Sequence, residues 1–249
     1  MRIHLIGSSC LALLLFSSAM AQDSTALNRA EVGAVKTKLA AVRDAMGGIP
    51  PGYALESEDF SLPTNFNPAR KGKFWPISSS VYLRYTDKAL QDAEANAEQA
   101  AADFQARYMA AVMSGNETAM QAAMSEMMQA QSGAGSTVKE EMAINVQFNV
   151  NPYAGIDPDG VLFEQSGVIA LVDNDVANKS GQVSVYFDPV ALRETETLSK
   201  VELNTPQDGV SNRSGVFNVT ITLRGAVEDI EALARKIDTS AVLAVIDSQ

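Results

Sequence analysis

A long alanine-rich stretch, from Asp87 to Gln131, constrains the fold of this chain more than any other part of the sequence. Small and apolar residues recur in it at three- and four-residue spacing, which places them on one stripe of an α-helix. Ser114-Gly115-Asn116 interrupts the pattern, and Asn116 can cap a new helix. We therefore predict a helical hairpin at 87–131, with helices at about 87–113 and 117–131. The stripe of the first helix consists of Leu90, Ala93, Ala97, Ala101, Phe104, Tyr108 and Val112.

The second of these helices is rich in methionine, and Met120, Met124 and Met127 fall on one of its faces. Thioether sulfurs are soft ligands suited to Cu(I), so one hypothesis is a soft-metal site. A second hypothesis is an adaptable surface that binds apolar partners. The same spacing is found in any helix that packs on a core, and we favour the interpretation that methionine fills the space between this helix and a sheet.

The first residues have the features of a secretory signal. Met1-Arg2 gives a positive start, Leu11–Phe16 is a short apolar run, and Ala19-Met20-Ala21 matches a cleavage site. The apolar run is too short to cross a bilayer, and no later stretch is long and apolar enough to do so. We predict a signal peptide at 1–21, cleavage after Ala21, and a mature protein that is periplasmic or secreted.

The mature chain is expected to be acidic and to lack the commonest catalytic side chains. Of the 19 basic and 30 acidic residues, cleavage removes only Arg2, which leaves 18 against 30 and a net charge of −12. Such a charge argues against binding to nucleic acid or to anionic lipid. Cleavage also removes His4 and Cys10, the only histidine and the only cysteine. This excludes disulfides, thiol nucleophiles, Ser-His-Asp triads and His/Cys zinc sites, and we expect no cofactor.

An amphipathic helix is predicted at 22–46, with Asp23 or Ser24 as its cap and Gly47–Gly52 as its end. It packs on the rest of the protein in the interpretation that we favour, and it forms an oligomer contact in the alternative. Its apolar stripe has steps of three and four residues and consists of Val32, Val35, Leu39, Val42 and Met46.

Residues 47–77 are predicted to form an extended connector, because they hold five of the nine prolines together with five aromatic residues. A dense basic cluster, Arg70, Lys71 and Lys73, precedes Phe74 and Trp75. One hypothesis is a ligand-binding segment whose cations and rings hold a sugar or an anion. The interpretation that we favour is an ordered connector whose aromatic side chains anchor it to the core.

The remainder, 78–249, is predicted to be an α+β domain whose part at 137–249 is rich in strands. Residues 78–85 and 142–150 alternate between apolar and polar side chains, as half-buried strands do. Near the end of the chain, a strand at 217–223, a helix after Gly225 and a short strand at 242–246 predict a β-α-β unit. We expect a mainly antiparallel sheet of about five to seven strands with the long helices packed on one face, and ferredoxin-like halves are one possible arrangement.

The sequence contains no G-x-S-x-G, S-x-x-K with its companions, P-loop or dinucleotide fingerprint. Paired carboxylates or a metal held by oxygen atoms remain as routes to catalysis. We expect a non-catalytic binding or envelope-interaction protein, with an unknown protein or small molecule as partner. The alternatives are a periplasmic Cu(I) protein that uses the methionine face and a carboxylate-based hydrolase.

Overall fold

The protein is built on a seven-stranded antiparallel sheet with the strand order β1-β2-β3-β9-β7-β6-β5. The computed structural model describes residues 26–131, 139, 141–151, 154–175, 180–190 and 200–247, so the predicted signal peptide lies outside the described residues. The sheet consists of β1 (Tyr53–Ser61), β2 (Ser79–Asp87), β3 (Met142–Phe148), β5 (Val161–Gln165), β6 (Val168–Asp175), β7 (Ser180–Phe187) and β9 (Val219–Ala226). A second sheet pairs β4 (Ala154–Gly155) with β8 (Lys200–Val201).

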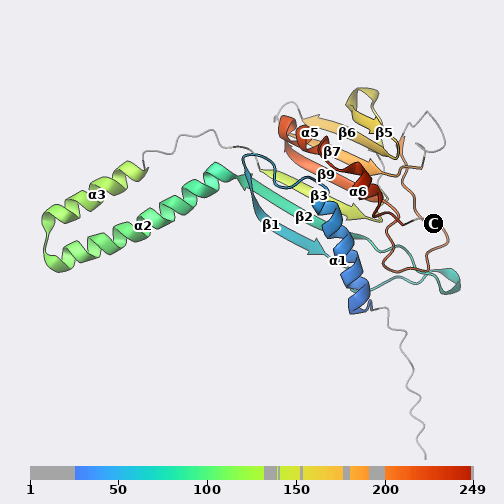
Figure 1. Cartoon of the computed structure of the whole chain (residues 1–249), viewed down its shortest axis with the longest axis horizontal. Coiled ribbons are helices and arrows are strands. Elements are labelled where there is room, and N and C mark those ends of the chain that lie inside the picture. Colours follow the sequence, from blue (N-terminus) through green and yellow to red (C-terminus); the bar gives the residue numbers. More distant parts are fainter. Residues whose placement is uncertain are drawn as a thin grey trace, which may run out of the picture.

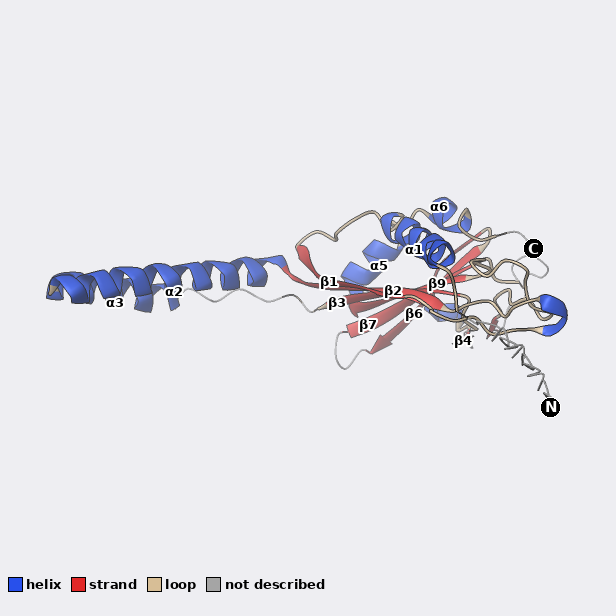
Figure 2. Ribbon diagram, turned by 90° about the horizontal axis from the view of Figure 1, so that it is seen from below, coloured by secondary structure: helices blue, strands red, loops and turns tan. Residues whose placement is uncertain are grey.

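Three helices lie on one face of the large sheet: α1 (Arg29–Asp44), α5 (Val227–Ala234) and α6 (Thr239–Leu243) (Figures 1 and 2). Asn28 begins α1 with a capping box, in which its side chain and that of Glu31 each accept a bond from the other's backbone N–H. The expected caps Asp23 and Ser24 lie outside the described residues. Val35, Leu39, Val42 and Met46 are at most 4% exposed. These four side chains of the stripe are therefore part of the core, as in the interpretation favoured from the sequence.

A single core joins this helix layer to the sheet. It includes the inward-facing side chains of β2, β3, β7 and β9 together with those of α1, α5 and α6. Segments from both halves of the chain thus share one set of contacts, which confirms an α+β protein with a mainly antiparallel sheet. The opposite face of the sheet is polar for much of its area, and the β4–β8 sheet covers part of it through Ile169, Tyr186, Val201 and Leu203.

The prediction of a final β-α-β unit is wrong in its last element. Residues 239–243 form α6, which begins where the Asp238 side chain accepts a bond from the Ala241 N–H (3.0 Å), and β9 is the last strand of the described residues. Both edges of β9 are already paired, with β3 and β7, so no further strand can be added beside it. The strand order, with every pairing antiparallel, also differs from that of ferredoxin-like halves.

The expected connector at 47–77 contains an additional strand, β1, which pairs with β2 along its length. Its sequence, YALESEDFS, is rich in acidic residues, because an edge strand has one side and one face open to solvent. A bulge between Leu55 and Ser57 breaks the alternation of side chains further. These two features conceal the strand in the sequence.

Candidate functional site

The most prominent feature of the molecule is a pair of helices that projects away from the sheet (Figures 1 and 2). Helices α2 (Lys88–Ser114) and α3 (Glu117–Gln131) follow β2 and precede β3, and we call residues 88–131 the arm. Gly115 ends α2 in the left-handed conformation (φ 67°), and the Asn116 side chain accepts a bond from the Ala119 N–H (3.1 Å) at the start of α3. The predicted hairpin and its break are confirmed.

The position of the arm differs from the prediction that the long helices pack on the sheet. Within the described residues, the core contains no side chain from the arm. The main contacts of α2 are with α3 and, at its base, with β1 and β2. The two helices approach each other through alanine, because Ala111 and Ala123 are only 5% and 6% exposed. Alanine permits this close approach, while Met109, Val112, Met113 and Met124 stay exposed.

Met120 and Met124 consequently do not fill a core between helix and sheet, so the interpretation favoured from the sequence is wrong for them, and the side chains of Met127 and Met128 lie outside the described residues. Met109, Met113 and Met124 are 54%, 86% and 55% exposed, and Val112 is 46% exposed. These residues account for four of the eight large hydrophobic side chains that are exposed in the described chain. An apolar surface gathered at the far end of a projecting element is typical of an interaction site.

The base of the arm is fixed to the sheet by Asp87, the last residue of β2. One carboxylate oxygen of Asp87 accepts a bond from the Ala89 N–H (2.7 Å), and the other accepts one from the Lys139 N–H (2.7 Å). The first bond caps α2, and the second ties the chain that returns from α3 to the same residue. The Lys88 N–H donates to the Gly52 carbonyl (3.0 Å), which adds a link to the turn before β1.

Charged and aromatic side chains reinforce this base. The Lys139 Nζ lies 4.8 Å from the centre of the Tyr53 ring and 3.3 Å from an Asp229 carboxylate oxygen, to which the Tyr53 hydroxyl also donates (2.8 Å). Gly52 has a φ of 82°, and a Cβ atom there would lie 3.2 Å from the Lys139 side chain. Tyr53 of β1 and Asp229 of α5 thus hold Lys139 beside the base of α2.

The arm has one apolar face and one face of small and charged residues. A shallow groove on the second face is lined from α2 by Arg107, Ala110 and Ser114 and from α3 by Ala119 and Ala122. At 100° per residue these positions lie to one side of the contact through Ala111 and Ala123. The residues on the other side form the apolar face, in which the Phe104 and Tyr108 rings stack 5.6 Å apart. We define this face as Phe104, Tyr108, Val112, Met120 and Met124.

The basic and aromatic segment lies in a different part of the molecule, where its rings have a structural role. Phe74 packs edge-on against Phe66, with ring centres 4.8 Å apart, and the Arg213 guanidinium lies 4.2 Å and 4.0 Å from the two ring centres. Backbone bonds between Phe74 and Val210 hold the segment in place. Phe74 is thus an anchor, as in the interpretation favoured from the sequence.

The remaining residues of that hypothesis lie on the surface beside this anchor. Arg70 and Lys71 are exposed in a 3₁₀ turn (Arg70–Gly72), Lys73 is half-buried, and Trp75 is 43% exposed. They lie along one short loop on the surface. The hypothesis of sugar or anion binding here stays a prediction.

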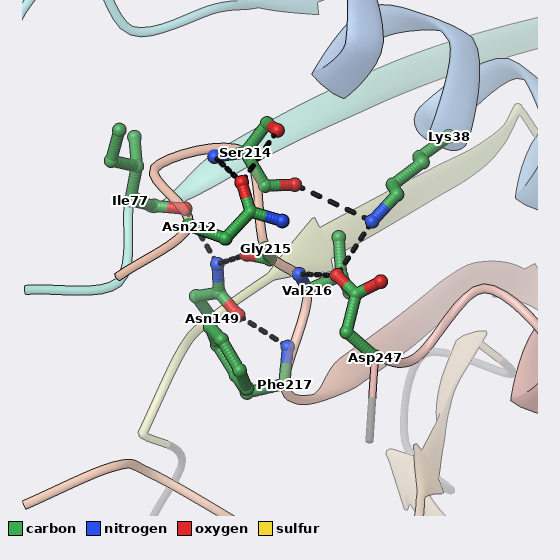
Figure 3. Close-up of polar contacts among 9 residues, drawn as sticks. All are labelled: Lys38, Ile77, Asn149, Asn212, Ser214, Gly215, Val216, Phe217 and Asp247. Atoms are coloured by element: carbon green, nitrogen blue, oxygen red, sulfur yellow. Dashed lines mark hydrogen bonds and ion pairs between the residues drawn. The ribbon is translucent and has the colours of Figure 1, made fainter. Parts of the chain in front are cut away.

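A network of polar contacts beside the end of β3 closes the core at the end away from the arm (Figure 3). Asn149 donates to the Ile77 and Gly215 carbonyls (2.9 Å each) and accepts from the Phe217 N–H (2.8 Å). Asp247 forms an ion pair with Lys38 of α1 (2.6 Å) and accepts from the Val216 N–H (2.7 Å). These groups satisfy one another, which indicates a structural role.

The open face of the sheet carries a second set of hydrogen-bonding side chains. Arg224 donates to Gln182 (2.8 Å), whose amide donates to Ser184 (3.3 Å) beside a cavity of about 300 Å³. Burial raises the pKa of the Tyr186 hydroxyl in the same cavity, although a hydrogen bond with Ser184 acts in the opposite direction. The sequence did not predict this set of side chains. Arg224 of β9 and Gln182 of β7 are distant in sequence, and only the register of the two strands brings them together.

In the described part of the chain, no group of three or more Asp, Glu, His or Cys side chains is placed to hold a metal ion. Met120 and Met124 lie one turn apart on α3, half-buried and exposed respectively, while the side chain of Met127 lies outside the described residues. The Cu(I) hypothesis is not tested by these positions.

Among the described helices, none combines the length and hydropathy needed to cross a membrane. Comparison of the chain with protein-family models, curated proteins and solved structures found no match.

Proposed function

We propose that the protein is an exported, non-catalytic binding protein of the cell envelope and that the arm is its binding element. One observation carries this proposal: the arm lies outside the core, yet it bears half of the large exposed apolar side chains of the described chain. Apolar surface costs about 25 cal/mol per Å² when it stays in water, and the arm does not bury it against the sheet. Contact with another molecule would offset this cost.

Two further features support an interaction role over one in folding. The base of α2 is held by the Asp87–Ala89 and Lys88–Gly52 hydrogen bonds and packs against β1 and β2, which supports a defined exit of the arm from the sheet. A rigid projecting element loses little conformational entropy when it binds. The predicted signal peptide at 1–21 supports a location in the periplasm or outside the cell.

Photo-crosslinking from the arm tests this function. No cysteine follows Cys10, so a single introduced cysteine is the only thiol in the mature protein and can carry a thiol-linked photo-crosslinker. Met124→Cys and Ile49→Cys provide a matched pair, because these side chains are 55% and 58% exposed on the arm and on the body. We expect a discrete adduct from position 124 and none from position 49 when the labelled protein is irradiated in its native envelope fraction.

An excess of unlabelled mature protein should compete for that adduct. Equal labelling from both positions, or no adduct from position 124, would contradict the assignment of the arm as the binding element. The mass of the adduct gives the identity of the partner, whether another protein or a second copy of this chain.

A further inference from the structure

We propose that the apolar face of the arm binds the same face of a second copy, so that two arms overlap in antiparallel orientation as a four-helix bundle. This inference rests on the proposed function, in which the arm is the binding element. The residues of the face are spaced four apart on each helix: Phe104, Tyr108 and Val112 on α2, and Met120 and Met124 on α3. Helices with such stripes pack in pairs through interlocking side chains in bundles.

The face is suited to a copy of itself because it contains no charged residue. A two-fold axis brings identical patches together, so a patch must be complementary to itself. A charged face fails this condition, since like charges would meet, whereas an apolar face meets it. From residue 108 to residue 125, which spans both sides of the turn, Glu117 is the only charged residue. Glu117 stands at the start of α3, three residues before Met120, and borders the face at its tip. Antiparallel arms place the two Glu117 carboxylates at opposite ends of the overlap, so these like charges do not meet.

The charges lower on the arm determine how far two copies can overlap. The stem of α2, from Lys88 to Asp103, has Lys88 as its only base and Asp92, Glu94, Glu98 and Asp103 as acids. Lys88 already pairs with Asp92 (2.9 Å), so the stem presents an excess of negative charge. Two parallel arms would place these stems side by side, and their repulsion disfavours that arrangement.

Antiparallel arms avoid this repulsion. If they overlap only along residues 104–114, each stem extends beyond the tip of the other arm, and the two bodies lie at opposite ends. Ten residues of α-helix span about 15 Å, so the overlap covers Phe104, Tyr108 and Val112 and the facing part of α3. The arms then bury the apolar face while the acidic stems stay in solvent.

Sedimentation velocity of the purified mature protein over a concentration series tests this dimer. We expect a reversible monomer–dimer equilibrium that strengthens as NaCl is added, because screening reduces repulsion between two acidic chains. A partner with a basic surface would show the opposite salt dependence. The double variant Val112→Gln/Met124→Gln should weaken the dimer by at least about tenfold. Glutamine is a good helix former, and at position 124 it also matches methionine in length, so α2 and α3 are retained.

Met113→Gln is the matched control, because Met113 is the more exposed side chain (86%) but, at 100° per residue, lies on the side of α2 opposite Ala111 and outside the apolar face. It should leave the dimer within about twofold of the unmodified protein, a difference below 0.5 kcal/mol. A protein that stays monomeric throughout, or a dimer that Met113→Gln weakens as much as the double variant does, would overturn the inference. If the protein is monomeric in sedimentation and position 124 crosslinks to a different protein, the proposed function stands and self-association through the arm is excluded.

Discussion

Replacement of Asn149 by alanine is expected to lower the free energy of unfolding by about 3–5 kcal/mol. The Asn149 side chain forms hydrogen bonds with three backbone groups, at Ile77, Gly215 and Phe217, and these groups lose their partner in the variant. The residue also has a φ of 54°, a left-handed conformation that costs alanine about 1 kcal/mol more than asparagine or glycine. Urea unfolding followed by circular dichroism measures the loss.

Two control variants separate these contributions. Asn149→Gly removes the same hydrogen bonds but tolerates the positive φ, so it should be less destabilising than alanine by about 1 kcal/mol. Asn145→Ala alters the open face of the same strand and should cost less than about 1 kcal/mol. If Asn149→Ala is no more destabilising than Asn145→Ala, the network at the end of β3 does not hold the core closed.

Leu39→Ala is expected to destabilise the monomer by about 3–5 kcal/mol, because it removes a fully buried side chain and leaves a cavity. Leu39 is 0% exposed and packs in the core shared by α1 and the sheet. Val32→Ala, a change at a half-buried position of the same helix, should cost about 1 kcal/mol. Thermal unfolding at several protein concentrations measures both changes.

The same experiment distinguishes a core helix from an oligomer contact. In the structure α1 stabilises each monomer, so Leu39→Ala should lower the midpoint by the same amount at every protein concentration and leave any concentration dependence of the unmodified protein unchanged. The opposite result has two parts: the midpoint of the unmodified protein rises with protein concentration, and the midpoint of Leu39→Ala does not. That result would show that the stripe of α1 joins two chains.

Local patterns in the sequence predicted the elements that depend on local interactions. The stripe from Val35 to Met46 predicted the buried side of α1, and the alternation from Met142 to Phe148 predicted β3. Gly115 and Asn116 predicted the break in the arm, because a left-handed residue and a cap act within one turn. In each case the pattern has the period of the element that it forms.

The features that were missed depend on contacts distant in sequence. Residues 242–246 form a short apolar run, which periodicity alone does not assign to helix or strand. A strand at this position would have no place beside β9, because β9 already pairs with β3 and β7, and only the order of the strands in the sheet reveals this. Likewise, the spacing of Met120 and Met124 is the same whether a helix packs on its own sheet or points away from it. The bonds from Asn149 span 66 to 72 residues and have no local signal.

The central claim is that the arm is separate from the core and serves contact with another molecule. Residues 87 and 139 are joined by a hydrogen bond of 2.7 Å, and β2 and β3 are neighbours, so a short Gly/Ser turn can replace residues 88–138. Urea unfolding of this armless protein is the most direct measurement. We expect a cooperative transition with a free energy of unfolding within about 1 kcal/mol of that of the full mature chain, at a protein concentration at which both are monomeric. An armless protein that fails to fold, or that loses several kcal/mol, would show that the arm supports the core and would contradict the claim.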